Sequence, residues 1–386
     1  MRPAALLLLL LGLHGPAGAQ GSPRSAAFVT RLGNDTIAVE RVVRDRGELR
    51  AEVLLRVPRT TLHVYRMRLD ASGRPVRLET TAHDPALGVG SPALSREVID
   101  FGADSLRIET TGGRSPGRAS VAGGRDVLPF IDMVHWPFEL VLQRAHAARG
   151  DSLAVPLLTG RRTQPFVVRR VGASDYTITH PFRGTMTARV GPGGVLAELD
   201  ASRTTRALRV SRVAAVDLPA LARRYAAIDA QGRPLGELSG RGEARGTLGG
   251  AAVAVDFGRP AKRGREIFGR LVPWGQVWRT GANRATHLTT DRDLLVGGTR
   301  VPAGTYTLFT IPGPDAWTLI VNRRTDINGT AYDAAHDLAR IPMQTRTLPE
   351  VVENFTVVVD EAGGALRLQW DTLEAYVPVR AAGPGA

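Results

Sequence analysis

The sequence predicts an all-β, mainly antiparallel protein, with an N-terminal curved sheet or open barrel that carries one helix and a C-terminal domain of the β-sandwich or jelly-roll-like type. Over residues 26–216 apolar and polar residues alternate with a period of two, as they do in 49–57, and this pattern is typical of half-buried strands. Turn-forming pairs such as Ser72-Gly73 separate these segments. Short strands return over residues 253–379, which predicts about eight strands of a second β domain.

One segment interrupts the alternation and predicts a helix near residues 137–149. Pro137 suits the first turn of a helix, because its missing N–H would be unpaired there in any case, and Gly150 suits a C-terminal cap. We expect this helix to plug or cover the sheet, and we expect a second, short helix over 218–228. The apolar face of the first helix consists of Phe138, Leu140, Val141, Leu142 and Ala145.

These patterns divide the chain into four segments. Residues 1–19 are predicted to be a signal peptide, and residues 20–228 the N-terminal β-rich domain with its helix near 137–149. Residues 229–250 are rich in Gly and Arg and poor in apolar residues, which indicates a linker or a lead-in to the next domain. Residues 251–386 are predicted to form the C-terminal β-sandwich domain.

The first residues have the three regions of a secretory signal peptide. Arg2 supplies positive charge, residues 4–13 are apolar, and small residues surround Ala19, after which we place cleavage. An apolar run of about ten residues is too short to cross a bilayer, which takes about 20 residues. We therefore expect an exported protein without a transmembrane segment, located in the periplasm or outside the cell.

The amino-acid composition excludes some classes of site and favours others. The chain contains no cysteine, which excludes disulfides, thiol nucleophiles and thiolate metal sites. Its formal net charge of +13 favours anionic partners. The arginines that supply this charge are scattered along strands, and we find no helix-turn-helix pattern, zinc-finger spacing or cluster of stacking aromatics, so we expect no nucleic-acid partner. The sequence leaves the oligomeric state open.

The sequence lacks complete motifs for a serine hydrolase, a zinc site or a calcium loop. Residues 113–117 have the G-x-S-x-G spacing of a serine-hydrolase elbow, but Pro116 follows the serine and has no N–H to donate to an oxyanion. The histidines show neither H-x-H nor H-E-x-x-H spacing, and Asp291 and Asp293 lack the rest of a calcium loop. We therefore predict no metal site and no cofactor.

The stretch 259–287 is the richest in recognition chemistry, because it combines basic and aromatic side chains with glycines and prolines that prevent a regular strand. Arginine forms bidentate hydrogen bonds with carboxylates and phosphates, and tryptophan offers a stacking surface. The alternative is that Trp274 and Trp278 belong to the core and that the arginines pair with carbonyls or acids. The predicted ligand site consists of Lys262, Arg263, Arg265, Trp278, Arg279, Thr280, Asn283 and His287.

The same stretch resembles a known bacterial family. The segments that carry the resemblance are Ile267-Phe268-Gly269, Leu271-Val272-Pro273-Trp274-Gly275, Val277-Trp278-Arg279-Thr280-Gly281-Ala282-Asn283 and Pro302-Ala303-Gly304-Thr305-Tyr306. Over about residues 235–380 the chain is similar to the bacterial domain-of-unknown-function family 2911. The resemblance implies an exported bacterial β domain and assigns no chemistry. Where the family pattern has an acidic residue after the asparagine, this chain has Arg284, so a site that used that acid would be altered here.

Three functions remain open at this point. The first is a non-catalytic binding or scaffolding protein of the cell envelope, whose partner is an anionic small molecule or an envelope glycan. It rests on the lack of a catalytic set, since residues 241–386 contain no serine. The second is a secreted hydrolase of glycans or peptides, in which Arg279 and Asn283 hold an oxyanion or carboxylate and His287 or Glu353 is the base. The third is a purely structural or protein-interaction domain, in which Arg279 is buried and paired.

Overall fold

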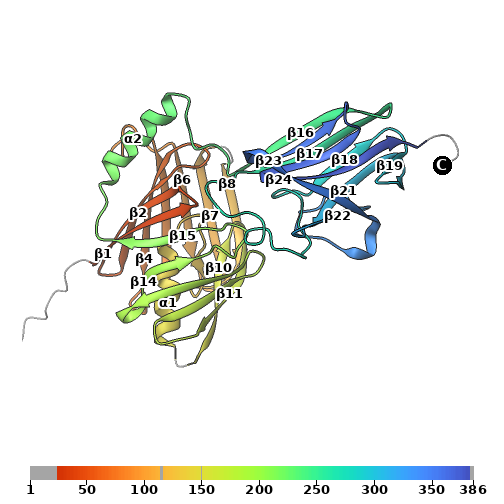
Figure 1. Ribbon diagram of the computed structural model, residues 1–386. Coiled ribbons are helices and arrows are strands. Elements are labelled where there is room, and N and C mark those ends of the chain that lie inside the picture. Colours follow the sequence, from red (N-terminus) through yellow and green to blue (C-terminus); the bar gives the residue numbers. More distant parts are fainter. Residues whose placement is uncertain (1–23, 114–115, 149, 383–386) are drawn as a thin grey trace, which may run out of the picture.

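The computed structural model describes residues 24–113, 116–148 and 150–382, and these residues form two β domains that lie side by side (Figure 1). Within the described residues one sheet has 15 strands and the other has nine. The prediction of an all-β, mainly antiparallel protein is confirmed. The predicted signal peptide, residues 1–19, lies outside the described residues.

The N-terminal domain is a single long sheet. In chain order its strands are β1 Arg24–Leu32, β2 Asp35–Asp45, β3 Glu48–Leu55, β4 Thr61–Leu69, β5 Pro75–His83, β6 Ser95–Phe101, β7 Ser105–Gly112, β8 Gly117–Ala122, β9 Leu128–Pro129, β10 Ser152–Thr159, β11 Arg162–Arg170, β12 Asp175–His180, β13 Gly184–Gly191, β14 Val195–Asp200 and β15 Arg209–Val213. A short 3₁₀ turn, Pro192–Gly194, precedes β14. Each strand pairs with its neighbours along the chain, except that β8 and β9 form the two ends of the sheet, and β1 pairs with β15 in its middle.

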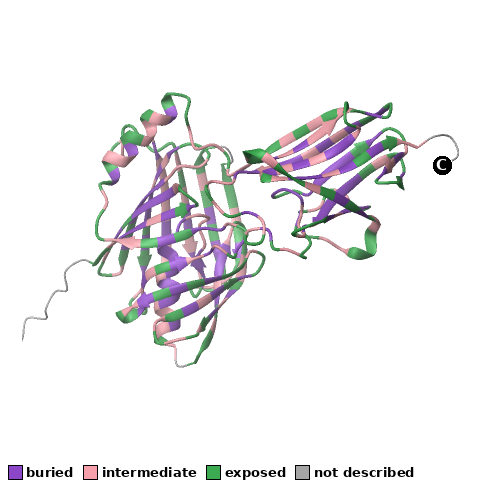
Figure 2. Cartoon of the chain, in the orientation of Figure 1, coloured by how far each residue is buried: buried purple, intermediate pink, exposed green. Residues whose placement is uncertain are grey.

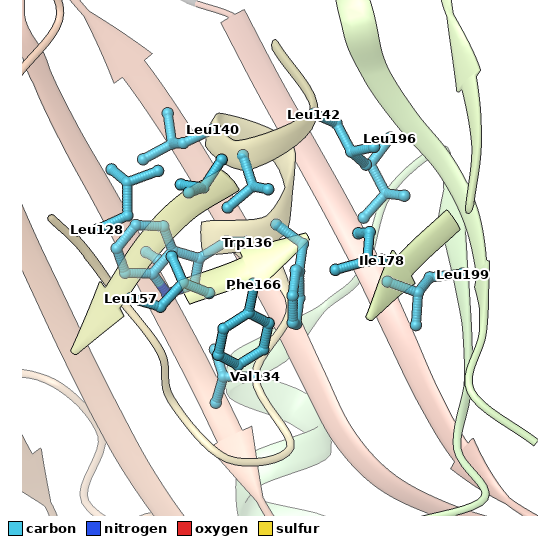
Figure 3. Packing of buried hydrophobic residues seen from close by; sticks show 14 of the residues in the cluster. Leu128, Val134, Trp136, Leu140, Leu142, Leu157, Phe166, Ile178, Leu196 and Leu199 are labelled. Carbon is cyan, nitrogen blue, oxygen red and sulfur yellow. The ribbon is translucent and has the colours of Figure 1, made fainter. Parts of the chain in front are cut away.

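This sheet curls until its two ends approach each other. The hydroxyl of Thr163 in β11 donates a hydrogen bond of 2.8 Å to the carbonyl of Ala122 in β8. The enclosed space is filled by helix α1, Trp136–Ala147, and Figure 3 shows Trp136 and Leu140 among the inward-facing side chains of the surrounding strands. The helix therefore plugs the curved sheet, as predicted.

The sequence predicted the start of α1 correctly but not its end. Pro137 lies in the first turn, but the C-terminal cap is not Gly150, because the helix ends at Ala147 and Ala148 is already extended. At the other end, the carboxylate of Glu40 accepts hydrogen bonds from the backbone N–H groups of His135 at 2.8 Å and Trp136 at 2.9 Å. A buried carboxylate therefore pairs with backbone N–H groups that have no partner within the helix.

A second helix, α2 Leu218–Ala230, packs against the outer face of the sheet (Figure 1). Its N-terminus is capped by Asp217, whose carboxylate accepts from the N–H of Ala220 at 3.0 Å. Leu218 and Ala222 bury an apolar patch of β2–β4. The sheet is therefore buried on both faces where α2 covers it, and Figure 2 shows the buried residues concentrated within the curl.

The C-terminal domain has the sandwich layout that the sequence predicted. Its strands are β16 Ser239–Leu248, β17 Ala251–Pro260, β18 Thr286–Thr290, β19 Leu294–Val296, β20 Thr299–Val301, β21 Gly304–Ile311, β22 Trp317–Asn322, β23 Asp337–Asp360 and β24 Ala365–Ala381, with a 3₁₀ turn at Ala334–His336. The register between β23 and β24 breaks twice, near residues 347 and 352, so this long pair bends and packs over β16 and β17. The resulting layers enclose a second apolar core.

The predicted linker over 229–250 needs a correction. Residues 239–248 form strand β16, which pairs over its whole length with β17, and α2 extends to Ala230. The sequence looked like a linker because β16 is an edge strand with few apolar residues, and most of it is only partly buried. The connection between the domains is therefore short.

Two turns join the domains. The backbone N–H of Asn34, in the turn between β1 and β2, donates to the carbonyl of Arg263 at 3.1 Å, and the guanidinium of Arg263 forms an ion pair of 2.5 Å with Asp35. Gly33 is required at this junction, since a Cβ there would lie 1.8 Å from the carbonyl oxygen of Arg263.

Among the described residues, no helix is long and apolar enough to span a membrane.

Candidate functional site: an arginine-rich cleft between the domains

A cleft of about 630 Å³ lies where the loops of the two domains meet. This volume falls in the range of about 300–1,000 Å³ that is typical of small-molecule sites. Five arginines line it, and the described lining residues include no aspartate and no glutamate. The N-terminal domain contributes Arg183, Arg203 and Arg206, and the C-terminal domain contributes Arg265 and Arg279.

The segment 279–283 forms one wall of the cleft and is held by a dense set of hydrogen bonds. Trp278 and Thr310 exchange two backbone hydrogen bonds of 2.7 and 2.9 Å. The fully buried Thr280 donates its hydroxyl to that of Thr310 at 3.1 Å, and its carbonyl accepts from the hydroxyl of Thr286 at 2.6 Å. These contacts fix the backbone, so that the side chains of Arg279 and Asn283 are presented to the cleft.

Arg279 is partly buried and has no carboxylate partner among the described residues. Its Nε donates to the carbonyl of Gly281 at 3.3 Å, which leaves the two terminal nitrogens for a ligand. The side chain packs closely on Gly329, where an added Cβ would lie 2.8 Å from both Cβ and Cδ of Arg279. Gly329 also donates its N–H to the carbonyl of Asn283 at 2.9 Å, so it positions both ends of this wall.

Arg265 approaches the cleft from the preceding loop. Its Nε donates to the carbonyl of Lys262 at 3.0 Å, and Nη2 donates to the carbonyl of Ala261 at 2.5 Å. These bonds orient the guanidinium but do not neutralise its charge. Burial, together with the nearby Arg263, lowers the pKa of Arg265 to about 10.

The remaining arginines are supplied by loops of the N-terminal domain. Arg183 and Arg206 both pair with Asp132, which lies behind them; the Arg183 contact is 2.6 Å. Burial raises the pKa of Asp132, but the two arginines outweigh burial and leave it below its ordinary value. Asp132 therefore stays ionised and fixes two of the cationic side chains at the rim. For Arg203 no ion pair is found among the described residues.

The positive charges act on one another across the domain boundary. Burial lowers the pKa of Arg279, and repulsion by Arg206 lowers it further. Desolvated like charges that face each other destabilise the charged forms, and a bound anion would relieve this cost. The electrostatics of the cleft therefore favour a negatively charged ligand.

Trp278 and Trp370 give the cleft an aromatic side. Their rings stack with 5.9 Å between centroids and 15° between planes, and both residues line the cleft. Trp278 also packs edge-on against Phe355 at 5.2 Å. Trp278 therefore packs against the core of the C-terminal domain, as one of the two interpretations expected, and it also lines the cleft. Trp274 does not line the cleft and stacks instead on Phe268.

The structure separates the eight predicted site residues into two groups. Arg265, Trp278, Arg279 and Asn283 line the cleft, and Thr280 supports them from the core. Lys262 and Arg263 do not line it. Lys262 forms an ion pair with Asp371, and Arg263 belongs to the junction between the domains.

His287 also lies away from the cleft. It is buried on β18, and its Nε2 accepts a hydrogen bond of 3.2 Å from the backbone N–H of Asp326. Burial and the nearby Arg284 lower the pKa of His287, so the ring is neutral near pH 7. Glu353 does not line the cleft either, and its carboxylate accepts from the N–H of Arg263 at 2.7 Å.

A buried cluster of Thr30, His135 and Glu40 has the residue types of a hydrolytic triad but not the geometry. Thr30 lies 3.0 Å and Glu40 lies 3.4 Å from the same ring nitrogen, Nδ1 of His135. A relay needs the nucleophile and the orienting carboxylate on different nitrogens of the base. The cluster therefore anchors α1 to the sheet. Across the described residues, no three histidine, aspartate or glutamate side chains gather as metal ligands.

Fold and cleft together define a two-domain all-β protein with a cationic interdomain cleft. Its C-terminal domain, residues 239–379, matches the model of the family DUF2911, whose description is "protein of unknown function", and the predicted resemblance is confirmed. No curated protein matches the chain. Among solved structures, the β-barrel-like protein of domain of unknown function DUF1849 from Brucella abortus matches with a TM-score of 0.32 and 10% identity, over 50% of this chain and 95% of that one.

Proposed function

We propose that this is an exported protein of the cell envelope, in the periplasm or outside the cell, that binds an anionic small molecule or an anionic glycan without transforming it. The observation that carries the proposal is that five arginines and no carboxylate are among the described residues that line one cleft of ligand size, while the Asp132 carboxylate that holds Arg183 and Arg206 lies outside the lining. Arginine is the side chain best suited to bind carboxylates and phosphates bidentately.

Two further features support an anionic ligand. Arg265 and Arg279 are desolvated, and neither forms an ion pair with a carboxylate among the described residues, although Glu353 acts on Arg265 through its charge. An anion would therefore gain more from them than from exposed cations. The partly buried Trp278 borders the same space, and an aromatic side chain suits the apolar face of a sugar ring. An acidic sugar therefore satisfies both halves of the lining.

The two rival functions make different demands. A hydrolase would need a base next to Asn283, but His287 and Glu353 do not line the cleft and both are engaged in backbone hydrogen bonds. A purely structural role would require Arg279 to be essential for folding, because removing a paired buried group leaves its partners unsatisfied. The single side-chain hydrogen bond of Arg279 to Gly281 argues for a modest structural contribution.

The test is a thermal-shift assay on the secreted full chain with inorganic phosphate, glucuronate and glucose as probes. We expect glucuronate to raise the melting temperature of the wild type, because a ligand at 100 times its Kd stabilises the folded state by about 2.7 kcal/mol. Arg279→Gln should abolish the shift. The matched control is Arg292→Gln, an exposed arginine of the same domain outside the cleft, which should retain it.

The outcomes separate the three functions. If no probe shifts the wild type, anion binding at the cleft is contradicted. If Arg279→Gln fails to fold, the structural role gains support, and the exposed Asn283→Ala variant then carries the binding test. Export is tested separately by fractionating cells and sequencing the N-terminus of the released protein, which should begin at Gln20.

A further inference from the structure

A second cavity, in the N-terminal domain, has different chemistry from the cleft. It measures about 780 Å³ and lies between the inner face of β1–β3 and helix α1. Phe28, Val42, Leu49, Trp136 and Leu140 supply an apolar lining, while arginines are present in the same lining. The cavity is thus amphiphilic.

The strand register explains how arginines come to line an apolar cavity. Side chains two residues apart lie on the same face of a strand, so Arg24 shares the face of Ala26 and Phe28. On the neighbouring strand Arg44 shares the face of Val42. The register pairs Arg24 with Arg44 and Ala26 with Val42. The two arginines therefore lie opposite each other on the inner face, at the ends of two apolar rows.

Directly opposed like charges destabilise a sheet unless something neutralises them. Elsewhere in this sheet Arg50 faces Arg66 and Arg68 faces Arg77, but in each pair one member has a carboxylate partner. The partners are Glu52 for Arg50, at 2.7 Å, and Asp100 for Arg77, at 2.6 Å.

Arg24 and Arg44 lack such a partner within the part of the chain that the structure describes. Arg44 donates to the side-chain carbonyl of Gln143 at 3.0 Å, which carries no charge. The two acids of the lining bind other groups: Glu139 binds Arg212 and the N–H of Leu196 and acts on Arg44 only through its charge, without an ion pair. Asp45 lies 3.9 Å from Arg46. The opposed pair is thus prepared for an external anion.

The floor of the cavity also has an unsatisfied group. Trp136 is buried, with 1% of its surface exposed, and its indole N–H has no hydrogen-bond partner among the described residues. Native proteins rarely leave such a buried donor unpaired. The apolar side chains that line the cavity beside Trp136 suit a hydrocarbon chain and do not suit a free sugar or an inorganic anion.

We propose that this cavity binds a single-chain anionic amphiphile, with its acyl chain between α1 and β1–β3 and its carboxylate or phosphate headgroup on Arg24 and Arg44. The site is independent of the interdomain cleft, since the two linings share no residue. Burying an acyl chain here removes apolar surface from water, which favours binding, and the opposed arginines supply headgroup selectivity.

The test is equilibrium dialysis of the secreted full chain against dodecanoate, dodecyl phosphate, 1-dodecanol and inorganic phosphate. We expect dodecanoate or dodecyl phosphate to bind, and a preference between these two distinguishes a carboxylate from a phosphate headgroup. Arg24→Gln/Arg44→Gln should weaken the preferred amphiphile at least tenfold and leave 1-dodecanol unchanged. The matched control, Arg66→Gln/Arg68→Gln, removes two exposed arginines outside the cavity and should bind like the wild type.

A third variant tests the tail. Ala26→Phe fills the cavity between the arginine pair and its floor, and it should abolish binding of both the amphiphile and the alcohol. The proposal is overturned if the wild type binds neither anionic amphiphile, if inorganic phosphate alone binds as tightly, or if the Arg24→Gln/Arg44→Gln chain keeps the wild-type affinity. Should Ala26→Phe fail to fold, the arginine variants still decide the matter. Failure here leaves the cleft proposal untouched, because Arg279 lies in the other lining.

Discussion

Replacing Glu40 by glutamine should loosen helix α1 from the curved sheet. Glu40 is fully buried and accepts from two helix N–H groups at 2.8 and 2.9 Å. Hydrogen bonds to a charged group contribute about 1.5–3 kcal/mol each, and an anion at a helix N-terminus adds about 0.3–1 kcal/mol. Glutamine keeps one acceptor oxygen and turns an NH₂ group toward the other N–H. We therefore expect a loss of about 2–4 kcal/mol from the stability of the N-terminal domain.

Hydrogen exchange measured by mass spectrometry on the full chain gives this free energy directly. Peptides covering 136–147 should exchange faster by the factor that corresponds to about 2–4 kcal/mol, which is roughly 30- to 1,000-fold. Peptides from the C-terminal domain serve as the internal reference. Glu48→Gln, an exposed glutamate on a neighbouring strand, is the matched variant and should change exchange little. An effect of Glu40→Gln below about 1 kcal/mol would refute the role of this carboxylate as the anchor of α1.

Three further predictions follow from close contacts and from titration. Gly329→Ala places a methyl group 2.8 Å from the Arg279 side chain, so it should cost about 1–3 kcal/mol and abolish the glucuronate thermal shift; an unchanged shift would contradict the proposed position of Arg279. Gly33→Ala adds a Cβ 1.8 Å from the Arg263 carbonyl at a positive φ of 57°, so small-angle scattering should show the domains moving apart, and an unchanged profile would refute it. Burial lowers the pKa of His180 to about 4, against about 6.5 in an unfolded chain, so the unfolded state binds the extra proton and stability falls as pH decreases from about 6.5 to 4. Because burial lowers the pKa of His63 to about 4 as well, His180→Gln should reduce the slope of that part of a urea-unfolding pH profile without removing it, and an unchanged slope would contradict the role of His180.

The fold was predictable to the extent that burial follows local periodicity. The alternation over 49–57 identified β3, and the apolar face after Pro137 identified α1, because each of these segments packs on one side against a large core. Strand β16 was missed because it lies at the edge of its sheet and has few apolar residues to reveal it. At one of its glycines, Gly242, an added Cβ would lie 2.4 Å from the side chain of Arg259.

The candidate site was predictable only on the C-terminal side. Arg279 and Asn283 belong to a segment whose composition already suggested recognition, and both line the cleft. Arg183, Arg203 and Arg206 were not singled out, because they are scattered among other arginines and reach the cleft only through the way the two domains meet. The way the domains meet depends on contacts between segments that are far apart in sequence. The ion pair between Arg263 and Asp35, which are 228 residues apart, is the clearest of these contacts. No local pattern contains this information.

The central claim is that the interdomain cleft binds anions through its arginines, and calorimetric titration of glucuronate into the full chain tests it most directly. We predict binding to the wild type and to Arg292→Gln, at least tenfold weaker binding to Arg279→Gln, and weaker binding to all chains at high salt because ions screen the attraction. Equal affinity of Arg279→Gln and the wild type, or no binding by a folded wild-type chain, would contradict the claim.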